Sequence, residues 1–492
     1  MVLLWLVLIP LIGGILCLTA GRGNARAPRW IAIAAISLDL MLTATLWAGT
    51  PGSGWWRQFD RSWIPEFGIR FHLALDGFSL SLLLLTFFLG LMSILASWNE
   101  ITERVAFFHF NLLWVLAGIA GVFLSVDLFL FYLFWELMLV PMYFLIGIWG
   151  HGRKIYAAIK FFLFTQISGL LMLAAIVALA ILYQQKSGSY SFELDALRNL
   201  PLSPGAGRIL MLGFFAAFAV KLPAIPFHTW LPDAHTEAPT AGSVVLAGLL
   251  LKTGAYGLIR FVLPLFPDAA GEFAPAMMAL GVAGVLYGAF MAVAQSDLKR
   301  LIAYTSVSHM GFVLIGIFAG NPTALTGAFI QMISHGISTG ALFIIAGALQ
   351  QRMHTREIAR MGGLWQTVPA LSGAAFFFIM ASVGLPGLGD FVGEFLVLLG
   401  TFQTHAVVAT LATVGIIVAT LYGLRLTAKV FQGPNSRDWV LPDLFPREWV
   451  VAVCMMAGLL WLGLYPQSFI DMFKAVVQQP VQAASSVDLA RR

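Results

Sequence analysis

The stretch that decides the fold runs from Lys221 to Lys252 and reads KLPAIPFHTWLPDAHTEAPTAGSVVLAGLLLK. Apolar runs flank it, FFAAFAV at 214–220 and TGAYGLIRFVLPLF at 253–266, so both lysines lie inside hydrophobic segments. An ammonium deep in hydrocarbon costs about 2.5–3.5 kcal/mol on the insertion scale. The polar and helix-breaking residues between them are Pro223, Pro226, Pro232, His228, His235, Asp233 and Glu237. Two costly cations around a broken helix indicate a path for charge.

The composition indicates a protein that crosses the membrane many times. Of the 492 residues, 60% are hydrophobic and 10% are charged, whereas soluble domains carry about 25% charged residues. The net charge of +5 does not indicate nucleic acid, because no basic run exceeds two residues. We find no P-loop and no dinucleotide fingerprint. Cys17 and Cys454 both lie in apolar runs, and we expect neither a disulfide nor a metal site from them.

About twenty apolar residues span a bilayer, and the sequence predicts fourteen such spans, the first in place of a cleaved signal peptide. They are 2–20, 30–49, 73–97, 107–125, 127–149, 156–183, 207–231, 240–263, 274–295, 300–319, 325–349, 366–400, 405–431 and 447–466. Pro223 and Pro226 break the span at 207–231, since each removes a backbone donor. The span at 366–400 is too long for one straight helix, and its centre, GLPGLGDFVGE, predicts a second break.

Broken spans in two halves of a chain are typical of the inverted repeats of transporters. The predicted fold is an all-α polytopic membrane protein with about 14 transmembrane helices and two inverted five-helix repeats, each with a broken helix. We divide the chain into a three-helix segment at 1–106, a first repeat at 107–263, a second at 274–431, and a final helix and tail at 432–492.

Lysine and arginine in the loops predict the orientation, because cytoplasmic loops are enriched in them. With both termini on the periplasmic side, the inside loops hold Arg22, Arg26, Arg29, Arg104, Arg153, Lys154, Lys299, Arg300, Arg352, Arg356, Arg360, Arg437 and Arg447. The longer outside segments hold Arg57, Arg61, Arg70, Lys186, Arg198, Arg208, Lys474, Arg491 and Arg492. We therefore expect a multi-pass protein of the bacterial inner membrane with both termini outside.

Several charged residues lie near the middle of their spans. Glu136 follows Asp127 by nine residues, which is about 14 Å along a helix. Lys221 and Lys252 are equally deep, and Lys160 lies near a helix start, where it can snorkel. Burial disfavours the charged form of each group, so a buried acid beside a lysine can take up and release a proton. The alternatives are a structural ion pair for Glu136 and a helix-capping cation for Lys221.

Four histidines and two acids extend this set. His309 and His335 sit near mid-depth among Ser and Thr, and histidine titrates near neutrality; the alternative is two hydrogen-bonded core histidines. Asp390 and Glu394 are four residues apart and share a face if the helix has resumed, unless Asp390 caps the second half-helix. His228 and His235 lie beside a loop. With Glu237 their spacing does not match a zinc motif.

The string Glu136, Lys221, Lys252, His309, His335 and Glu394 suits lateral proton transfer along the middle of the membrane. Such a pump must draw its energy from a partner, because the chain shows no nucleotide motif. A sugar transporter would not need so many acid–base groups in line.

The stretch from Lys221 to Arg260 resembles the signature of the antiporter-like subunits of proton-pumping NADH:quinone oxidoreductase, respiratory complex I. Three further motifs are similar to subunit M, chain 4 in mitochondria: LFYLFWELMLVPMYFLIGIWG at 130–150 with KFFLFTQ after it, SDLKRLIAYTSVSHMGF at 296–312, and LPGLGDFVGEF at 385–395. In that subunit the second broken helix carries glutamate, as Glu394 does here, where sister subunits L and N tend to have lysine. The resemblance covers 73–467.

The resemblance implies roles for individual residues. Glu136 and Lys221 match the buried Glu–Lys pair of the family, and Lys252 matches its central lysine. His309 and His335 match the connecting histidines and Glu394 the exit-side acid. Asp390 departs from the family, where we expect a small or amide residue, and suggests that Asp390 and Glu394 titrate as a coupled pair.

The resemblance also implies partners and cofactors. The subunit would lie in the membrane arm between subunits L and N, bind no cofactor or metal itself, and couple electron transfer from NADH to quinone to proton export. FMN, iron–sulfur clusters, NADH and quinone would belong to other subunits. The alternatives are a subunit of a multisubunit sodium/proton antiporter or a membrane-bound hydrogenase, and a structural spacer that conducts nothing.

Overall fold

A computed structural model of the chain describes residues 1–21, 24, 26–49, 54–435, 437–474 and 476. The first half contains α1 (Val2–Ala20), α2 (Ala27–Ala48), β1 (Arg57–Ile64), β2 (Ile69–Leu75), α3 (Gly77–Ala96), α4 (Val105–Leu124), α5 (Leu128–Leu137), α6 (Leu139–Trp149), α7 (Lys154–Ser187), α8 (Leu194–Leu197), α9 (Pro204–Lys221), α10 (Trp230–Glu237), α11 (Thr240–Val245), α12 (Leu251–Gly257) and α13 (Leu263–Leu265). The second half contains α14 (Pro267–Ala294), α15 (Leu298–Phe318), α16 (Pro322–Met353), α17 (Leu364–Thr367), α18 (Pro369–Ser382), α19 (Gly389–Thr404), α20 (Ala406–Leu426) and α21 (Pro446–Leu464).

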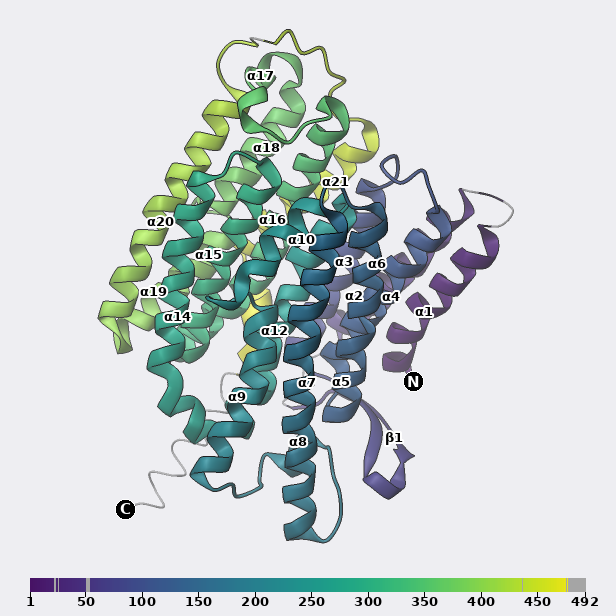
Figure 1. Cartoon of the computed structure of the whole chain (residues 1–492), viewed down its shortest axis with the longest axis vertical. Coiled ribbons are helices and arrows are strands. Elements are labelled where there is room, and N and C mark those ends of the chain that lie inside the picture. Colours follow the sequence, from purple (N-terminus) through teal and green to yellow (C-terminus); the bar gives the residue numbers. More distant parts are fainter. Residues whose placement is uncertain (22–23, 25, 50–53, 436, 475, 477–492) are drawn as a thin grey trace.

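The predicted all-helical membrane fold is confirmed. Among the described residues, 13 helices are long and apolar enough to cross a membrane. The broken helix predicted at 366–400 is confirmed: residues 383–388 separate α18 from α19. With 14 and 16 residues, α18 and α19 are not among those 13 helices. The helices stand side by side as one elongated bundle, with α1 at one flank and α20 at the other (Figure 1).

The first break falls where the prolines predict it. Helix α9 ends at Lys221, a short 3-10 turn covers Phe227–Thr229, and α10 begins at Trp230. Only two hydrogen bonds extend α9 into the break, from Leu222 N to Phe218 O and from Ala224 N to Ala219 O. The ring nitrogens of proline cannot continue the series.

A β-hairpin that the sequence interpretation missed lies at one end of the bundle. Strands β1 and β2 pair antiparallel, and Gly68 between them has φ +65, a left-handed conformation that suits glycine. Arg70 binds Asp60 through two hydrogen bonds of 2.8 and 2.6 Å. The hairpin lies at the same end as α8, and α17 lies at the opposite end (Figure 1).

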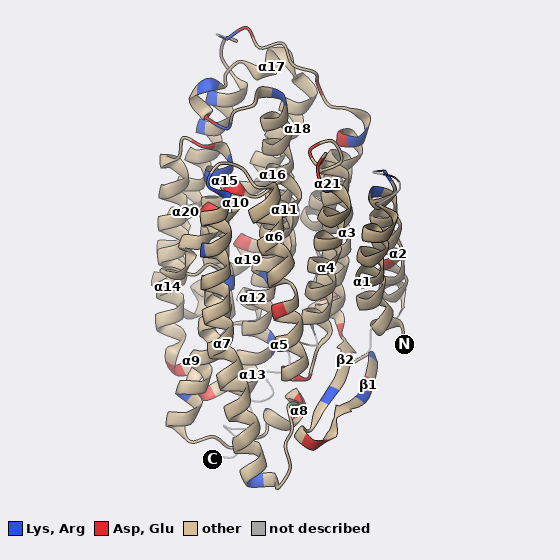
Figure 2. Ribbon diagram, turned by 45° about the vertical axis from the view of Figure 1, so that its right-hand side comes forward, with Lys and Arg blue, Asp and Glu red and all other residues tan. Residues whose placement is uncertain are grey.

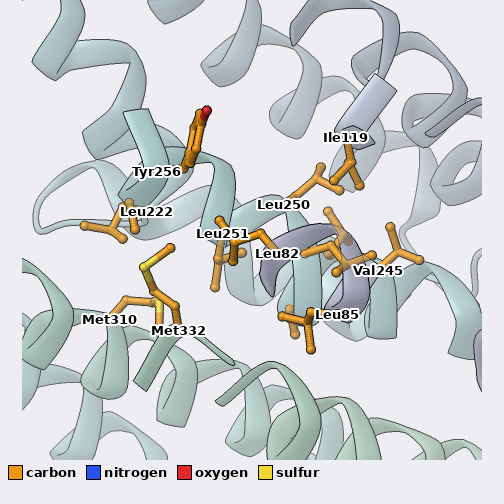
Figure 3. Packing of buried hydrophobic residues seen from close by; sticks show 14 of the residues in the cluster. Leu82, Leu85, Ile119, Leu222, Val245, Leu250, Leu251, Tyr256, Met310 and Met332 are labelled. Carbon is orange, nitrogen blue, oxygen red and sulfur yellow. The ribbon is translucent and has the colours of Figure 1, made fainter. Parts of the chain in front are cut away.

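The helix that carries Lys252 runs through the core of the bundle. Every residue from Thr240 to Val262 is buried, and a helix that is apolar all round belongs inside a protein. Leu250 and Leu251 pack among side chains of α3, α15 and α16 (Figure 3). Lys252 therefore lies in protein rather than in lipid.

Charged residues gather at the two ends of the bundle, and a few lie at mid-height near α5, α12 and α19 (Figure 2). The end that carries α17 also carries the basic loop residues that we place inside. Arg22, Arg491 and Arg492, which we counted in the orientation argument, lie outside the described residues.

Candidate functional site

Lys221 is the last residue of α9, and its side chain is closed off from solvent. The residue is 1% exposed. Its Nζ lies 5.0 Å from the ring centroid of Trp135 and 5.6 Å from that of Phe161. Among the described residues Nζ has no hydrogen-bond partner. The capping alternative is therefore wrong in this structure, because the ammonium bonds no carbonyl of the break and rests on aromatic faces instead.

Glu136 lies at the junction of α5 and α6, next to Trp135. Its Oε1 is buried and lacks a hydrogen-bond partner among the described residues. The same oxygen would lie 2.7 Å from a Cβ added at Gly169 of α7, so a glycine there lets the carboxylate approach that helix. The charge of Glu136 acts on Lys221 across space. The two groups are neighbours in electrostatic terms without a direct ion pair in the part of the chain that the structure describes.

Backbone contact joins the first break to the central helix. A Cβ added at Gly254 of α12 would lie 2.8 Å from Leu222 N and 3.2 Å from the Cβ of Lys221. Only glycine permits this approach. Lys221 and Lys252 thus lie on two elements in backbone contact.

Lys252 follows a π-helical turn at Leu246–Leu250. Such turns widen a helix by one residue and occur often at functional sites. The Nζ donates to Ala247 O inside that turn at 2.6 Å, and it lies 2.6 Å from His335 Nδ1. Lys252 and His335 are both 0% exposed. The lysine is therefore in direct hydrogen-bond contact with a group that can exchange a proton with it.

His335 and His309 connect Lys252 to the second break. Their ring centroids are 5.4 Å apart with a T-shaped arrangement. His309 Nδ1 lies 2.7 Å from Glu394 Oε1, and both side chains are almost fully buried. The structure thus brings Lys252, His335, His309 and Glu394 into one series, with short contacts at both ends and a ring-to-ring step between them.

Glu394 is the sixth residue of α19, just after the second break. A Cβ added at Gly384, within the break, would lie 3.4 Å from its Oε2. Ser382 Oγ and Tyr422 OH lie 3.2 and 3.4 Å from the other nitrogen of His309. The pair of His309 and Glu394 is therefore held by a polar shell from α18 and α20.

Asp390 lies in the first turn of α19 and is 0% exposed. Its Oδ1 is 3.4 Å from Gln331 Nε2, and the same nitrogen is 3.4 Å from Glu394 Oε1. Asp390 is not the N-cap residue of α19: that position is Leu388, which makes no side-chain capping hydrogen bond. One amide of α16 thus bridges the two carboxylates.

The remaining predicted residues lie outside this series. The Nζ of Lys160 lies 2.7 Å from Asp233 of α10, with side chains 19% and 18% exposed, so this lysine forms a partly buried ion pair. His228 lies against Tyr287 with ring centroids 5.1 Å apart. His235 is stacked on Phe343 at 4.7 Å.

Glu237 lies 4.0 Å from a nitrogen of Arg356. Among the described residues, one group brings three possible metal-binding atoms within 4.8 Å of one another, namely Asp60, His72 and Glu193 of the hairpin end. Glu237 and the two histidines near it do not form such a group.

Three contacting residues were missed by sequence reasoning. Gln331 precedes His335 by four residues and so lies on the same helical face, a signal that could have found it. Ser382 and Tyr422 carry no such signal, because only the folded bundle brings α18 and α20 to His309.

The sequence matches the family described as NADH:quinone oxidoreductase/Mrp antiporter, TM, over residues 125–420. The chain is 51% identical to NADH-quinone oxidoreductase subunit M of Pseudomonas aeruginosa, with 99% of each chain covered. It is also 51% identical to that of Escherichia coli, with 96% of each covered.

Solved structures agree with these relatives. A chain of respiratory complex I from Thermus thermophilus with bound NADH superposes with a TM-score of 0.88 at 32% identity, covering 97% of this chain and 99% of that one. A chain of the Mrp complex from Dietzia superposes with a TM-score of 0.84 at 21% identity, which shows a shared fold. The chain belongs to the NADH-quinone oxidoreductase subunit M family, the antiporter-like, proton-translocating membrane subunits of respiratory complex I that carry no cofactor themselves.

Proposed function

We propose that protons cross this subunit along Glu136, Lys221, Lys252, His335, His309 and Glu394. The observation that carries the proposal is the 2.6 Å contact between Lys252 Nζ and His335 Nδ1 in a fully buried setting. A buried lysine that is bonded to an imidazole can pass its proton directly to the ring nitrogen, so that the amine becomes neutral and the positive charge moves to the histidine.

In this sequence of steps Glu136 biases the charge on Lys221 and the second break releases the proton. A proton on Lys221 is stabilised while Glu136 is ionised, and it becomes costly once that carboxylate is neutralised. The proton then moves toward Lys252, and from there through the histidines to Glu394. Ordered water would complete the steps that side chains alone do not bridge.

Lys252→Met tests the path. Methionine keeps much of the volume of lysine and removes the ionisable group. We expect proton pumping driven by NADH in inverted membrane vesicles to fall at least about tenfold, a change of about 1.4 kcal/mol in the barrier. Lys186→Met, at the exposed end of α7, is the matched control. Full pumping by an assembled complex with Lys252→Met would favour a spacer that conducts nothing.

We also propose that 107–263 and 274–431 form the two inverted repeats. In support, the interrupted helix is the fourth crossing of each segment, α9 with α10 in the first and α18 with α19 in the second. An odd number of crossings reverses the direction of the second segment. A variant in which 274–431 is forced to cross the membrane in the same direction as 107–263 should fail to assemble into the complex.

The orientation that we propose places both termini in the periplasm. The support is the concentration of Lys and Arg in the loops at the α17 end, which positive-inside statistics assign to the cytoplasm. Alkaline phosphatase fused after the last residue should be active, because it folds in the periplasm. An active cytoplasmic reporter at that position would reverse the topology.

Finally, we propose that subunits L and N flank this one. Helices α1 and α2 lie at one flank and α20 at the other (Figure 2), and they expose large apolar side chains, including Trp30 at 62% and Ile417 at 62%. Single cysteines at these two positions, with Cys17→Ser and Cys454→Ser as background, should cross-link to two different sister subunits. Cross-links from both positions to the same subunit would contradict the arrangement.

A further inference from the structure

Gln331 of α16 occupies an unusual place among the titrating groups. It is 0% exposed. Its Nε2 lies 3.4 Å from each of three groups, His309 Nδ1, Asp390 Oδ1 and Glu394 Oε1. An amide nitrogen has two N–H donors and no charge. Gln331 can therefore stabilise negative charge on either carboxylate without changing its own protonation.

The backbone of α19 fixes the position of Gln331. A Cβ added at Gly393 would lie 2.4 Å from Gln331 Oε1 and 2.7 Å from the Gln331 backbone nitrogen. This glycine stands between Asp390 and Glu394 in the sequence. The helices thus pack so closely that the amide is set against the two acids.

Asp390 has charged and polar neighbours on every side. The charge of Asp390 acts electrostatically on Lys252 of α12 and on His309 of α15. Ser334 and Ser338 of α16 face it. Its Oδ2 is buried and has no hydrogen-bond partner among the described residues.

One N–H donor of the Lys252 ammonium is left unused by the hydrogen bonds that the structure shows. An ammonium carries three N–H donors, and the contacts of Lys252 with Ala247 O and His335 use two of them. No ion pair joins the remaining donor to the unpartnered oxygen of Asp390 in the part of the chain that the structure describes, so a water molecule would have to link the two groups. Asp390 is in turn bridged to Glu394 by Gln331, so the acid stands between the lysine and the predicted exit residue.

We propose that Asp390 is a further proton carrier, parallel to the two histidines, and that Gln331 positions Asp390 and Glu394 as a pair that shares one proton. In the transfer, an N–H bond of the Lys252 ammonium breaks as a proton passes to an intervening water molecule, and that water gives one of its own protons to Asp390, which leaves a neutral amine, a neutral acid and an unchanged water. The proton then passes to the Glu394 carboxylate, and Asp390 returns to its anion. Gln331 keeps all its hydrogens. This inference rests on the proton path proposed above.

The test is a double-mutant cycle in the assembled complex, with protons pumped per NADH oxidised as the readout. Asp390→Asn removes the acid branch with little change of shape, and His335→Gln removes the histidine branch. We expect each single variant to lose about half of the pumping and the double variant to lose more than about tenfold, because either branch alone still conducts. Native gels establish that each variant assembles. The inference would be overturned if the double variant pumped as well as the slower single variant, or if Asp390→Asn lost no pumping.

Gln331→Met tests the positioning role. The loss of pumping in Gln331→Met should equal that in Asp390→Asn. Adding Gln331→Met to Asp390→Asn should cause no further loss of pumping, whereas a packing defect would reduce pumping in that background too. A further loss there would overturn the role of Gln331. Lys252→Met distinguishes failure of the whole proton path from failure of the Asp390 branch. Unchanged pumping in Lys252→Met refutes the whole path. Lost pumping in Lys252→Met together with unchanged pumping in Asp390→Asn refutes only the Asp390 branch.

Discussion

The two broken helices differ in how they hold their charge. At the last residue before the first break stands Lys221, whose ammonium rests on two aromatic rings without a hydrogen-bond partner among the described residues. At the same place before the second break stands Ser382, which bonds His309, and the ionisable groups, Asp390 and Glu394, follow the break. The first break isolates one charge, and the second distributes charge over a polar network.

The helix ends fit these signs. A helix C-terminus favours a cation and an N-terminus favours an anion, each by about 0.3–1 kcal/mol. Lys221 ends α9, whereas Asp390 lies in the first turn of α19. Each break therefore places its charged residue at the helix end that stabilises that charge, the cation at a C-terminus and the acid at an N-terminus. An isolated cation is sensitive to one neighbour, Glu136, whereas the networked acids are buffered by several.

The largest effect is expected from removing the isolated charge. Lys221→Met should abolish NADH-driven pumping to within the noise of the vesicle assay, because no second cation at that break can replace it. The same variant should still assemble, since methionine fills the apolar box of Trp135 and Phe161. Pumping above about a tenth of the native rate, a barrier change under about 1.4 kcal/mol, would show that the first break is dispensable.

A smaller effect is expected at the networked end. Glu394→Gln should reduce pumping about five- to tenfold, equal to about 1–1.4 kcal/mol, because Asp390 remains next to Gln331 as a second carboxylate. The measurement is the initial rate of fluorescence quenching at equal complex content. A loss as complete as that of Lys221→Met would remove the contrast between the two breaks.

Gly169→Ala probes the link from Glu136 to the first break without removing any ionisable group. The added Cβ would lie 2.7 Å from Glu136 Oε1, so the carboxylate must move away from α7. We expect a two- to threefold loss of pumping, about 0.4–0.7 kcal/mol. Gly271→Ala, where nothing lies within 4 Å, is the control. Equal rates in both variants would mean that the position of Glu136 has little influence.

The smallest effect should come from the aromatic box. Cation–π contacts contribute about 0.5–2 kcal/mol, and Phe161 would remain after Trp135→Leu. We expect about a twofold loss of pumping in that variant and near-native pumping in Trp135→Phe, which keeps an aromatic face. Identical losses in the two variants would point to packing rather than to the ammonium.

The sequence was sufficient for the helical fold and for the positions of both breaks. Apolar runs of about twenty residues and prolines or glycines inside them act locally, so they can be recognised without the fold. The hairpin of β1 and β2 was missed, because its polar residues lie outside apolar runs. The split of the predicted span at 366–400 into α18 and α19 was expected, and its observed start at Pro369 is three residues later than predicted.

The candidate site was predictable in its ionisable residues and not in their contacts. Lys221, Lys252 and Glu394 stand out because charge in a membrane is costly. Gln331 and Tyr422 do not stand out, since neutral polar side chains are common in such helices. The contact between Lys252 and His335 joins residues 83 positions apart, and only tertiary packing creates it.

The proposed path requires that the two breaks belong to one continuous line of proton transfer. The direct measurement is protons pumped per second in complexes carrying Lys221→Arg, Glu394→Asp, or both, since each single variant keeps its charge and should retain part of the activity. One continuous line predicts that the double variant is no slower than the slower single variant, because one step limits the flow. Losses that multiply in the double variant would show two independent routes and contradict the account.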